Sequence, residues 1–355
     1  MSFAFFEAPG EIRSEATPRR PARELVIGEL SAEQPADWSV DDVVFGAAPQ
    51  AQLHKCTLPE SQAPSALCAE LADLGAPQAE AALASTDLVT DVYEGGFKLW
   101  ECARDLLEVL HDTLHRGELK LDGAAVLEAG CGVGLPGAYA LQGGASRLVL
   151  QDFNAAVLRL VTAPTLRLNG LWPRLEAGDV RLLSGDWADV SALLSAERRD
   201  ATRGREKGEG KESVGEEGEA GDGEEGEGKE GDGDAARGDG AYDLILSADT
   251  IYNAEATRRL WKLVSEQLRD GGVAYIAAKS YYFGVGGSVA DLLALVTADG
   301  RFDCRTVRTF EDGASNRREV LELRWRQTCR RAESSPRREP GSCRPDADAG
   351  GGAPR

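Results

Sequence analysis

Apolar residues recur at helical spacing from Leu99 to Leu114, which predicts an amphipathic helix over this stretch. After it, short apolar runs alternate with amphipathic segments of helical length. The predicted strands cover residues 126–129, 147–151, 181–183, 242–247, 272–278, 302–310 and 320–326, and the predicted helices cover 136–142, 155–169 (interrupted by Pro164), 254–269 and 289–298. This alternation indicates βαβ units and a mostly parallel sheet. The last two strands are joined by the short turn Asp312–Gly313, which predicts an antiparallel edge.

Three stretches lack this pattern, so we expect one folded domain over residues 86–326 with disordered appendages. Residues 1–85 are rich in Ala, Pro, Glu and Gln with only short apolar clusters, so we expect them to be mostly disordered, with at most one docking segment. In residues 200–240, fifteen Asp and Glu stand against six Lys and Arg, with hardly any apolar residue. We expect this acidic, Gly- and Glu-rich insertion to be a disordered loop, because it cannot bury enough surface to offset the entropy of ordering. The Arg- and Pro-rich tail, residues 327–355, is expected to be disordered as well.

The formal net charge of the 355-residue chain is −20. This charge argues against direct binding of nucleic-acid phosphates or of an anionic membrane, and it favours a basic partner. Seven cysteines without metal-ligand spacing predict reduced thiols and no metal site. His111 and His115 share a predicted helix face but lack the glutamate of a zinc-protease motif, so we expect solvated side chains. The absence of a signal-like start and of a bilayer-spanning run predicts a soluble intracellular protein.

A glycine-rich stretch carries the first candidate chemistry. Residues 127–134 read Leu-Glu-Ala-Gly-Cys-Gly-Val-Gly, which predicts a strand, a tight turn and a helix whose bare backbone a nucleotide-like ligand can approach. Glu128, before the first glycine, suits the hydroxyls or cationic amino group of a ligand such as S-adenosylmethionine (SAM) and not a pyrophosphate. A second apolar run ends at Asp152, where a carboxylate can hold a ribose diol. These features indicate a SAM-dependent methyltransferase; the alternative is a glycine-rich turn in another α/β protein.

Five further stretches combine residues in a more specific way: Asp91–Cys102 (DVYEGGFKLWEC), Gln151–Asn154 (QDFN), Gly185–Trp187 (GDW), Asp243–Asn253 (DLILSADTIYN) and Lys279–Gly287 (KSYYFGVGG). In this order, over about residues 86–326, the chain resembles the protein-histidine N-methyltransferases of the methyltransferase-like group. The resemblance implies a class I fold: a seven-stranded, mostly parallel sheet with an antiparallel edge strand and helices on both faces. It also implies methyl transfer from SAM to a histidine of a large-subunit ribosomal protein, and residence in the cytoplasm, nucleus and nucleolus.

The chain departs from the family pattern at three places. Glu128 stands where the family often has Asp, which preserves a carboxylate. Ala248 and Asp249 stand where Ser and Glu are expected, and Ser280–Tyr281 replaces an Ala-His pair near the expected substrate entrance.

Carried over position by position, the resemblance implies a cofactor site. Asp152 would accept the ribose hydroxyls and Asp186 the adenine amine, while Trp187 or Phe153 would offer a flat apolar face to the base. For Trp187 and Trp100, core packing is the alternative. The implied cofactor-binding residues are Leu99, Trp100, Glu101, Cys102, Ala103, Glu128, Gly130, Gly132, Gln151, Asp152, Phe153, Gly185, Asp186, Trp187 and Ala248.

Histidine methylation requires alignment more than acid–base catalysis. An imidazole with its ordinary pKa of about 6.5 is mostly neutral at pH 7, so its lone pair can attack the methyl group directly. An acceptor for the other ring N–H would select the tautomer, and a carboxylate would also stabilise the imidazolium as it forms. Asp249, Asn253 and Tyr282, at strand ends on the cofactor side, are the catalytic candidates, with Asp249 first. The alternative for Asp249 is a cap on the following helix.

Two other functions stay open. A lysine methyltransferase of the related class I group shares the fold and the cofactor loop, but it has to deprotonate an ammonium group. A SAM-binding module that escorts a basic ribosomal protein without catalysis fits the acidic charge equally well. We expect a basic protein partner, no direct contact with nucleic acid or membrane, and a monomer.

Overall fold

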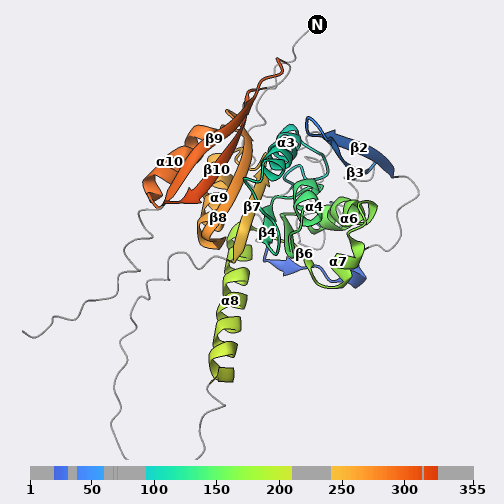
Figure 1. The fold of residues 1–355 in the computed structure, drawn as a ribbon, viewed down its shortest axis with the longest axis vertical. Coiled ribbons are helices and arrows are strands. Elements are labelled where there is room, and N and C mark those ends of the chain that lie inside the picture. Colours follow the sequence, from blue (N-terminus) through green and yellow to red (C-terminus); the bar gives the residue numbers. More distant parts are fainter. Residues whose placement is uncertain are drawn as a thin grey trace, which may run out of the picture. The chain divides into compact units, whose positions relative to one another are not determined.

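One eight-stranded sheet organises the part of the chain that the structure describes, residues 20–30, 38–59, 67, 70, 93–209, 241–313 and 316–326. In this computed structural model the strand order is β1-β6-β5-β4-β7-β8-β10-β9 (Figure 1). The strands are β1 (Arg23–Glu24), β4 (Ala125–Ala129), β5 (Arg147–Asp152), β6 (Val180–Ser184), β7 (Tyr242–Ala248), β8 (Leu268–Lys279), β9 (Phe302–Phe310) and β10 (Arg318–Trp325).

The sheet confirms the predicted class of fold and adds one strand to it. Strands β4 to β8 pair in parallel, and β10 is antiparallel to both of its neighbours, β8 and β9. The antiparallel strand therefore lies one place inside the edge, which β9 forms. The seven predicted strands correspond to β4–β10. The eighth, β1, is antiparallel to β6 and comes from the region that we expected to be disordered.

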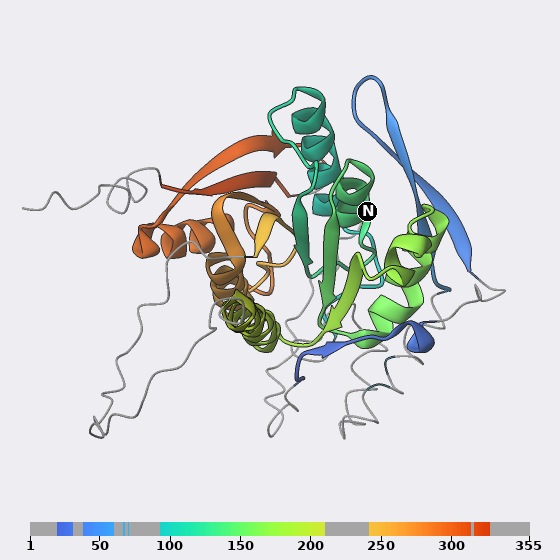
Figure 2. The same ribbon diagram turned by 60° about the horizontal axis from the view of Figure 1, so that its bottom comes forward.

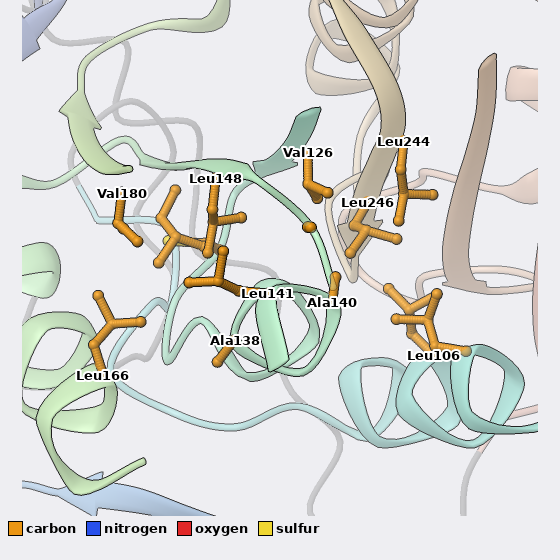
Figure 3. Packing of buried hydrophobic residues seen from close by; sticks show 14 of the residues in the cluster. Leu106, Val126, Ala138, Ala140, Leu141, Leu148, Leu166, Val180, Leu244 and Leu246 are labelled. Carbon is orange, nitrogen blue, oxygen red and sulfur yellow. The ribbon is translucent and has the colours of Figure 1, made fainter. Parts of the chain in front are cut away.

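Helices cover both faces of the sheet, as predicted. They are η1 (Ile27–Glu29), α3 (Glu101–His115), α4 (Leu135–Gln142), α5 (Ala155–Val157), η3 (Leu158–Thr162), α6 (Ala163–Leu168), α7 (Trp172–Glu176), α8 (Trp187–Glu209), α9 (Ala254–Gln267) and α10 (Val289–Asp299). Figure 3 shows Leu106 of α3 and Leu141 of α4 in the cluster that also contains Leu148 of the sheet. On the other face, Leu260 of α9 and Leu292 of α10 belong to a second cluster. Because both faces are covered, the central strands are almost entirely apolar.

The structure corrects the expectation for residues 39–57 within the range 1–85. Strands β2 (Ser39–Phe45) and β3 (Ala51–Thr57) form an antiparallel hairpin, which lies beside α4 and α6 in both Figure 1 and Figure 2. Val43, Phe45 and Leu53 of the hairpin are buried with Leu107 and Leu135. Only alternate hairpin residues face the helices, so the apolar signal in the sequence is too short to stand out.

The structure also corrects the expectation for the first ten residues of the range 200–240. Helix α8 continues to Glu209, so the first ten residues of the range 200–240 are helical. Arg, Lys and Glu in this stretch are good helix formers, which a count of charges alone overlooks. Residues 210–240, the tail from residue 327 and the rest of residues 1–85 lie outside the described residues.

The helix predicted over 155–169 is divided by a π-helical turn. Helix α5 passes into η3 over Leu158–Thr162, and α6 begins at Ala163. Pro164 has no backbone N–H, so the regular hydrogen-bond ladder cannot pass through it. Thr162 at this turn donates a hydrogen bond to the Gly132 carbonyl oxygen (2.6 Å), which fixes the helix against the glycine turn.

Candidate functional site

The glycine turn between β4 and α4 has the geometry that its sequence predicts. Gly130, Gly132 and Gly134 have φ angles of 65°, 50° and 77°. A Cβ atom on Gly130 would lie 2.6 Å from the Thr250 methyl carbon, and one on Gly132 would lie 3.0 Å from the Gly96 carbonyl oxygen. Backbone angle and space both require glycine here, so the turn presents bare backbone at the carboxyl end of β4.

Two side chains at the end of β5 are bonded to this turn. Gln151 Oε1 accepts a hydrogen bond from Gly130 N–H (3.0 Å), and Asp152 Oδ2 accepts one from Gly132 N–H (2.9 Å). Asp152 Oδ1 accepts a further bond from Asn154 N–H (3.1 Å). Burial raises the pKa of Asp152 to about 6, although these N–H groups act to lower it. Each carboxylate oxygen keeps a second lone pair, so Asp152 can still accept hydroxyl groups.

The turn after β6 joins the same network. Trp187 Nε1–H donates to Gln151 Oε1 (2.6 Å), and Gln151 Nε2–H donates to the Gly185 carbonyl oxygen (2.8 Å). Asp186 caps the start of α8 by accepting from the N–H two residues on (2.8 Å), and its other oxygen pairs with Arg259 (2.9 Å). Gln151 thus connects three parts of the expected cofactor site, whereas both oxygens of Asp186 are engaged within the protein.

Residues 93–100 lead across the glycine turn into α3. Trp100 Nε1–H donates to the Gly95 carbonyl oxygen (2.9 Å), which closes a tight loop before the helix. Gly96 in this loop is close to Asp152 as well as to the glycine turn, since a Cβ atom on it would lie 3.0 Å from Asp152 Oδ2. Close packing of the backbone beside the site therefore requires the glycines of the Tyr-Glu-Gly-Gly stretch.

The residues of the expected wall Leu99–Ala103 lie in two different environments. Glu101, Cys102 and Ala103 form the first turn of α3, next to the end of β7. Leu99 instead packs against the apolar cluster that the β2–β3 hairpin shares with α3 and α4. Ala248, the last residue of β7, is half-buried against the core.

Asp249 connects β7, β8 and the start of α3. Its Oδ2 accepts from Cys102 N–H (3.0 Å) and its Oδ1 from Tyr282 O–H (2.9 Å). Its φ of 55° is unusual for a residue with a side chain and costs about 1–3 kcal/mol, a strain that is typical of functional positions. Burial raises the pKa of Asp249, while the Cys102 and Tyr282 hydrogen bonds and the Lys279 charge oppose that rise. The structure therefore brings together two of the three catalytic candidates.

Lys279, the last residue of β8, belongs to this cluster and was missed as a functional candidate. Its Nζ atom pairs with Glu101 (3.0 Å) and lies 5.8 Å from the centroid of the Trp100 ring. Burial lowers its pKa, but the Glu101 and Asp249 carboxylates outweigh burial and raise the pKa above its usual range. The signal in the sequence was its place directly after an apolar strand, in one of the family-specific stretches.

Two expected site residues have their polar atoms engaged elsewhere. Asn253 Oδ1 accepts from Ala256 N–H (2.8 Å) and caps α9, so Asn253 takes the capping role that was the alternative for Asp249. Glu128 lies beneath α4, where it accepts from Gly137 N–H (2.7 Å) and is 3% exposed. Burial raises the pKa of Glu128 to about 8. Strand alternation turns its side chain toward the helix-covered face and away from the rim of the turn.

His111 is also more buried than predicted. It is 3% exposed, and its Nδ1 lies 2.8 Å from the Tyr139 hydroxyl oxygen. Within the ranges that the structure describes, no three His, Cys, Asp or Glu side chains are grouped to hold a metal ion. None of the helices among the described residues has the length and apolar character needed to cross a membrane.

No protein-family model matches the chain. Among curated proteins, it is 35% identical over 247 residues to the histidine protein methyltransferase 1 homolog of Dictyostelium discoideum, covering 69% of this chain and 62% of that protein. This chain is a homologue of the histidine protein methyltransferase 1 proteins. It is also 30% identical to the Rattus norvegicus homolog (64% of this chain, 56% of that protein) and 31% identical to histidine protein methyltransferase 1 of Saccharomyces cerevisiae (59% and 58%). The chain thus spans somewhat more than half the length of these relatives.

Among solved structures, the similarity is more distant. The ribosomal protein L11 methylase of Lactobacillus delbrueckii subsp. bulgaricus is 14% identical, with a TM-score of 0.36, over 63% of this chain and 80% of that chain. The magnesium protoporphyrin IX methyltransferase of Synechocystis PCC 6803, solved with bound SAH, is 15% identical with a TM-score of 0.37, over 62% and 82%. The fold assignment therefore rests on the strand order and pairing of this sheet.

Proposed function

We propose that the protein is a SAM-dependent methyltransferase that modifies a histidine side chain of a protein substrate. The observation that carries the proposal is the convergence of the family-specific stretches on one site at the carboxyl ends of β4 to β8. The glycine turn, Asp152 and Gln151 lie on the β4–β6 side of this site. Asp249 and Tyr282 lie on the β7–β8 side. Ligand sites in open α/β sheets form at this edge.

The residues on the β4–β6 side fit a nucleoside. Gly130 and Gly132 are packed so closely by Thr250 and Gly96 that only bare backbone fits there, and the buried Asp152 keeps lone pairs for the ribose hydroxyls. Phe153 and Trp187 offer aromatic faces for the adenine. When bound there, SAM would supply an electrophilic methyl group on its sulfonium. Glu128 drops out of the contacts that we propose, because it is buried beneath α4 with its carboxylate bonded to Gly137 N–H. Asp186 is assigned instead to capping α8 and to pairing with Arg259.

The residues on the β7–β8 side fit an imidazole acceptor. Asp249 is held by Cys102 N–H and Tyr282 O–H, so its carboxylate is fixed before a substrate arrives. We propose that it accepts the N–H of the non-reacting ring nitrogen, which leaves the other nitrogen unprotonated for attack. The same negative charge stabilises the imidazolium as it forms. Tyr282 positions Asp249, and the Lys279–Glu101 pair completes the wall.

For the substrate, we propose a basic protein of the large ribosomal subunit. We propose that the enzyme is a monomer and that it acts in the cytoplasm and the nucleus, including the nucleolus. The net charge of −20 supports a basic partner and opposes direct contact with nucleic acid. The family resemblance supports the ribosomal assignment.

The test is incubation of the full chain with radiolabelled SAM and a lysate from cells that lack the endogenous enzyme, followed by amino-acid analysis of the labelled band. We expect the label in methylhistidine, and the mass of the labelled protein identifies the substrate. Label in methyllysine would favour the related lysine methyltransferases, and SAM binding without transfer would favour the escort module. Asp249→Asn should reduce transfer at least tenfold while SAM binding stays within about threefold; full activity of this variant would remove Asp249 from the mechanism.

A further inference from the structure

The N-terminal segment 20–25 lies on the loop that follows β6. Strand β1 pairs with β6, and Leu25 N–H donates to the Leu182 carbonyl oxygen (2.9 Å). The Arg20 carbonyl oxygen accepts from Asp186 N–H (3.1 Å). Gly185 has φ of 124°, and a Cβ atom there would lie 2.7 Å from the Pro21 carbonyl oxygen. The segment thus covers Gly185 and Asp186 so closely that Gly185 must be glycine.

Arg20 connects this segment to a second loop of the site. Its guanidinium pairs with Glu70 and lies 4.6 Å from the centroid of the Phe153 ring, at a distance typical of cation–π contact. Glu70 also accepts from Ala156 N–H (2.7 Å) and from the Asn154 side-chain amide (3.4 Å). Arg20 is 5% exposed and Glu70 11%. This buried ion pair therefore holds residues distant in sequence against the β5–α5 loop.

The two loops joined in this way are those that the proposed function assigns to the adenosine of SAM. Phe153 follows β5 directly, and Gly185 follows β6 directly. Pro21 and Ala22 also line a shallow, open surface depression with Asp189 and Leu193 of α8. A buried charge pair contributes little to stability compared with apolar packing, and its use here points to a role in geometry.

We propose that residues 20–22 form the outer wall of the adenosine site and that Arg20 is a positioning residue for the cofactor. Arg20 fixes the plane of Phe153 through its guanidinium and fixes the two loops through Glu70. The inference rests on the proposed function, because it takes the nucleoside of SAM as the ligand. It assigns a cofactor role to a part of the chain outside the domain that the sequence predicted, residues 86–326.

The test compares Arg20→Met with the matched control Arg23→Met by calorimetric titration with S-adenosylhomocysteine (SAH). Arg23 lies in the same segment, but it is half exposed and pairs with Glu29 on the surface (2.5 Å). We expect the SAH dissociation constant to rise about tenfold for Arg20→Met and to stay within about twofold for Arg23→Met. Methylthioadenosine, which lacks the amino-acid end, should lose affinity by the same factor, because the wall contacts only the nucleoside side.

Two further variants separate positioning from stability. Arg20→Lys keeps the charge for Glu70 but has no planar group for Phe153, so we expect stability near that of the unmodified protein with weakened SAH binding. The double variant Arg20→Met/Glu70→Gln removes both buried charges and should also bind SAH weakly while it remains folded. Unchanged or tighter SAH binding by a folded Arg20→Met protein overturns the proposal, since tighter binding would mean that the segment obstructs the site. If the unmodified protein fails to bind SAH at all, the proposed function fails together with this inference.

Discussion

The buried carboxyl group of Glu128 should make the stability of this protein depend on pH. In the folded chain the pKa of Glu128 is raised to about 8, from an ordinary value of 4.5. Between these two values the unfolded chain has released a proton that the folded chain still holds. The unfolded state therefore binds fewer protons, and the free energy of unfolding falls as the pH rises. Glutamine has nearly the same shape and no charge, so Glu128→Gln removes this dependence.

The magnitude follows from the two pKa values. Because Glu128 ionises more readily in the unfolded chain, it lowers the free energy of unfolding by about 1.4 kcal/mol at pH 5.5 and by about 3.9 kcal/mol at pH 7.5. The conversion is roughly 1.4 kcal/mol per pKa unit. The stability of Glu128→Gln relative to the unmodified protein should therefore increase by about 2.5 kcal/mol between these two pH values. Any constant difference in hydrogen bonding between the two side chains cancels in this comparison.

Urea unfolding, followed by tryptophan fluorescence at pH 5.5 and 7.5, measures this difference. Glu311→Gln, on the exposed turn before β10, is the control and should show no such change. Because Glu128 lies beneath α4, Glu128→Gln should also bind SAH within about threefold of the unmodified protein. An equal stability difference at both pH values would refute the raised pKa. A tenfold loss of SAH binding would restore the sequence-based expectation that Glu128 contacts the cofactor.

Three other substitutions test the site and its frame. Asn253→Ala removes the cap of α9 and should lower the unfolding free energy by about 1 kcal/mol in urea, with methyl transfer unchanged; a lost activity would return Asn253 to the catalytic group. Gly132→Ala has to place a Cβ atom 3.0 Å from a carbonyl oxygen at a φ of 50°, so SAH binding by calorimetry should weaken at least tenfold; normal binding would contradict the crowded turn. Arg318→Met leaves Asp105 buried without the guanidinium that now lies 2.6 Å away, and thermal unfolding should show a loss of about 3 kcal/mol, partly recovered in Arg318→Met/Asp105→Asn. No recovery would mean that packing, not charge, holds β10 to α3.

The sheet could be predicted from the sequence because its strands are buried on both faces. Runs such as Leu148–Leu150 are apolar throughout, and each is followed by a helix of recognisable length. The glycine turn could be predicted for a similar local reason, since three alternating glycines are required only where backbone angles and space exclude side chains. Strand β1 has only two residues, and no periodicity can be detected over that length.

The side-chain contacts of the site could be predicted only in part, because they join distant segments. Asp249 does cap a helix, but that helix is α3, whose first turn lies about 150 residues earlier in the chain. A local rule for caps considers only the following helix, where Asn253 has the correct spacing. Arg20 and Glu70 are separated by fifty positions in the sequence and meet at a third segment. Neither residue belongs to a motif that could have marked it.

The pairing of β1 with β6 has a consequence for how the protein is made. Arg23 pairs with Ser184, so the first described strand has to wait for a partner that is synthesised about 160 residues later. At about 5–20 residues per second, this wait lasts roughly 10–30 s on the ribosome. During that time β1 has no partner strand, and unpaired strand edges are sites of aggregation. Strand β1 therefore joins the sheet only after β6 has been synthesised, and a chaperone that binds extended segments would act before that step.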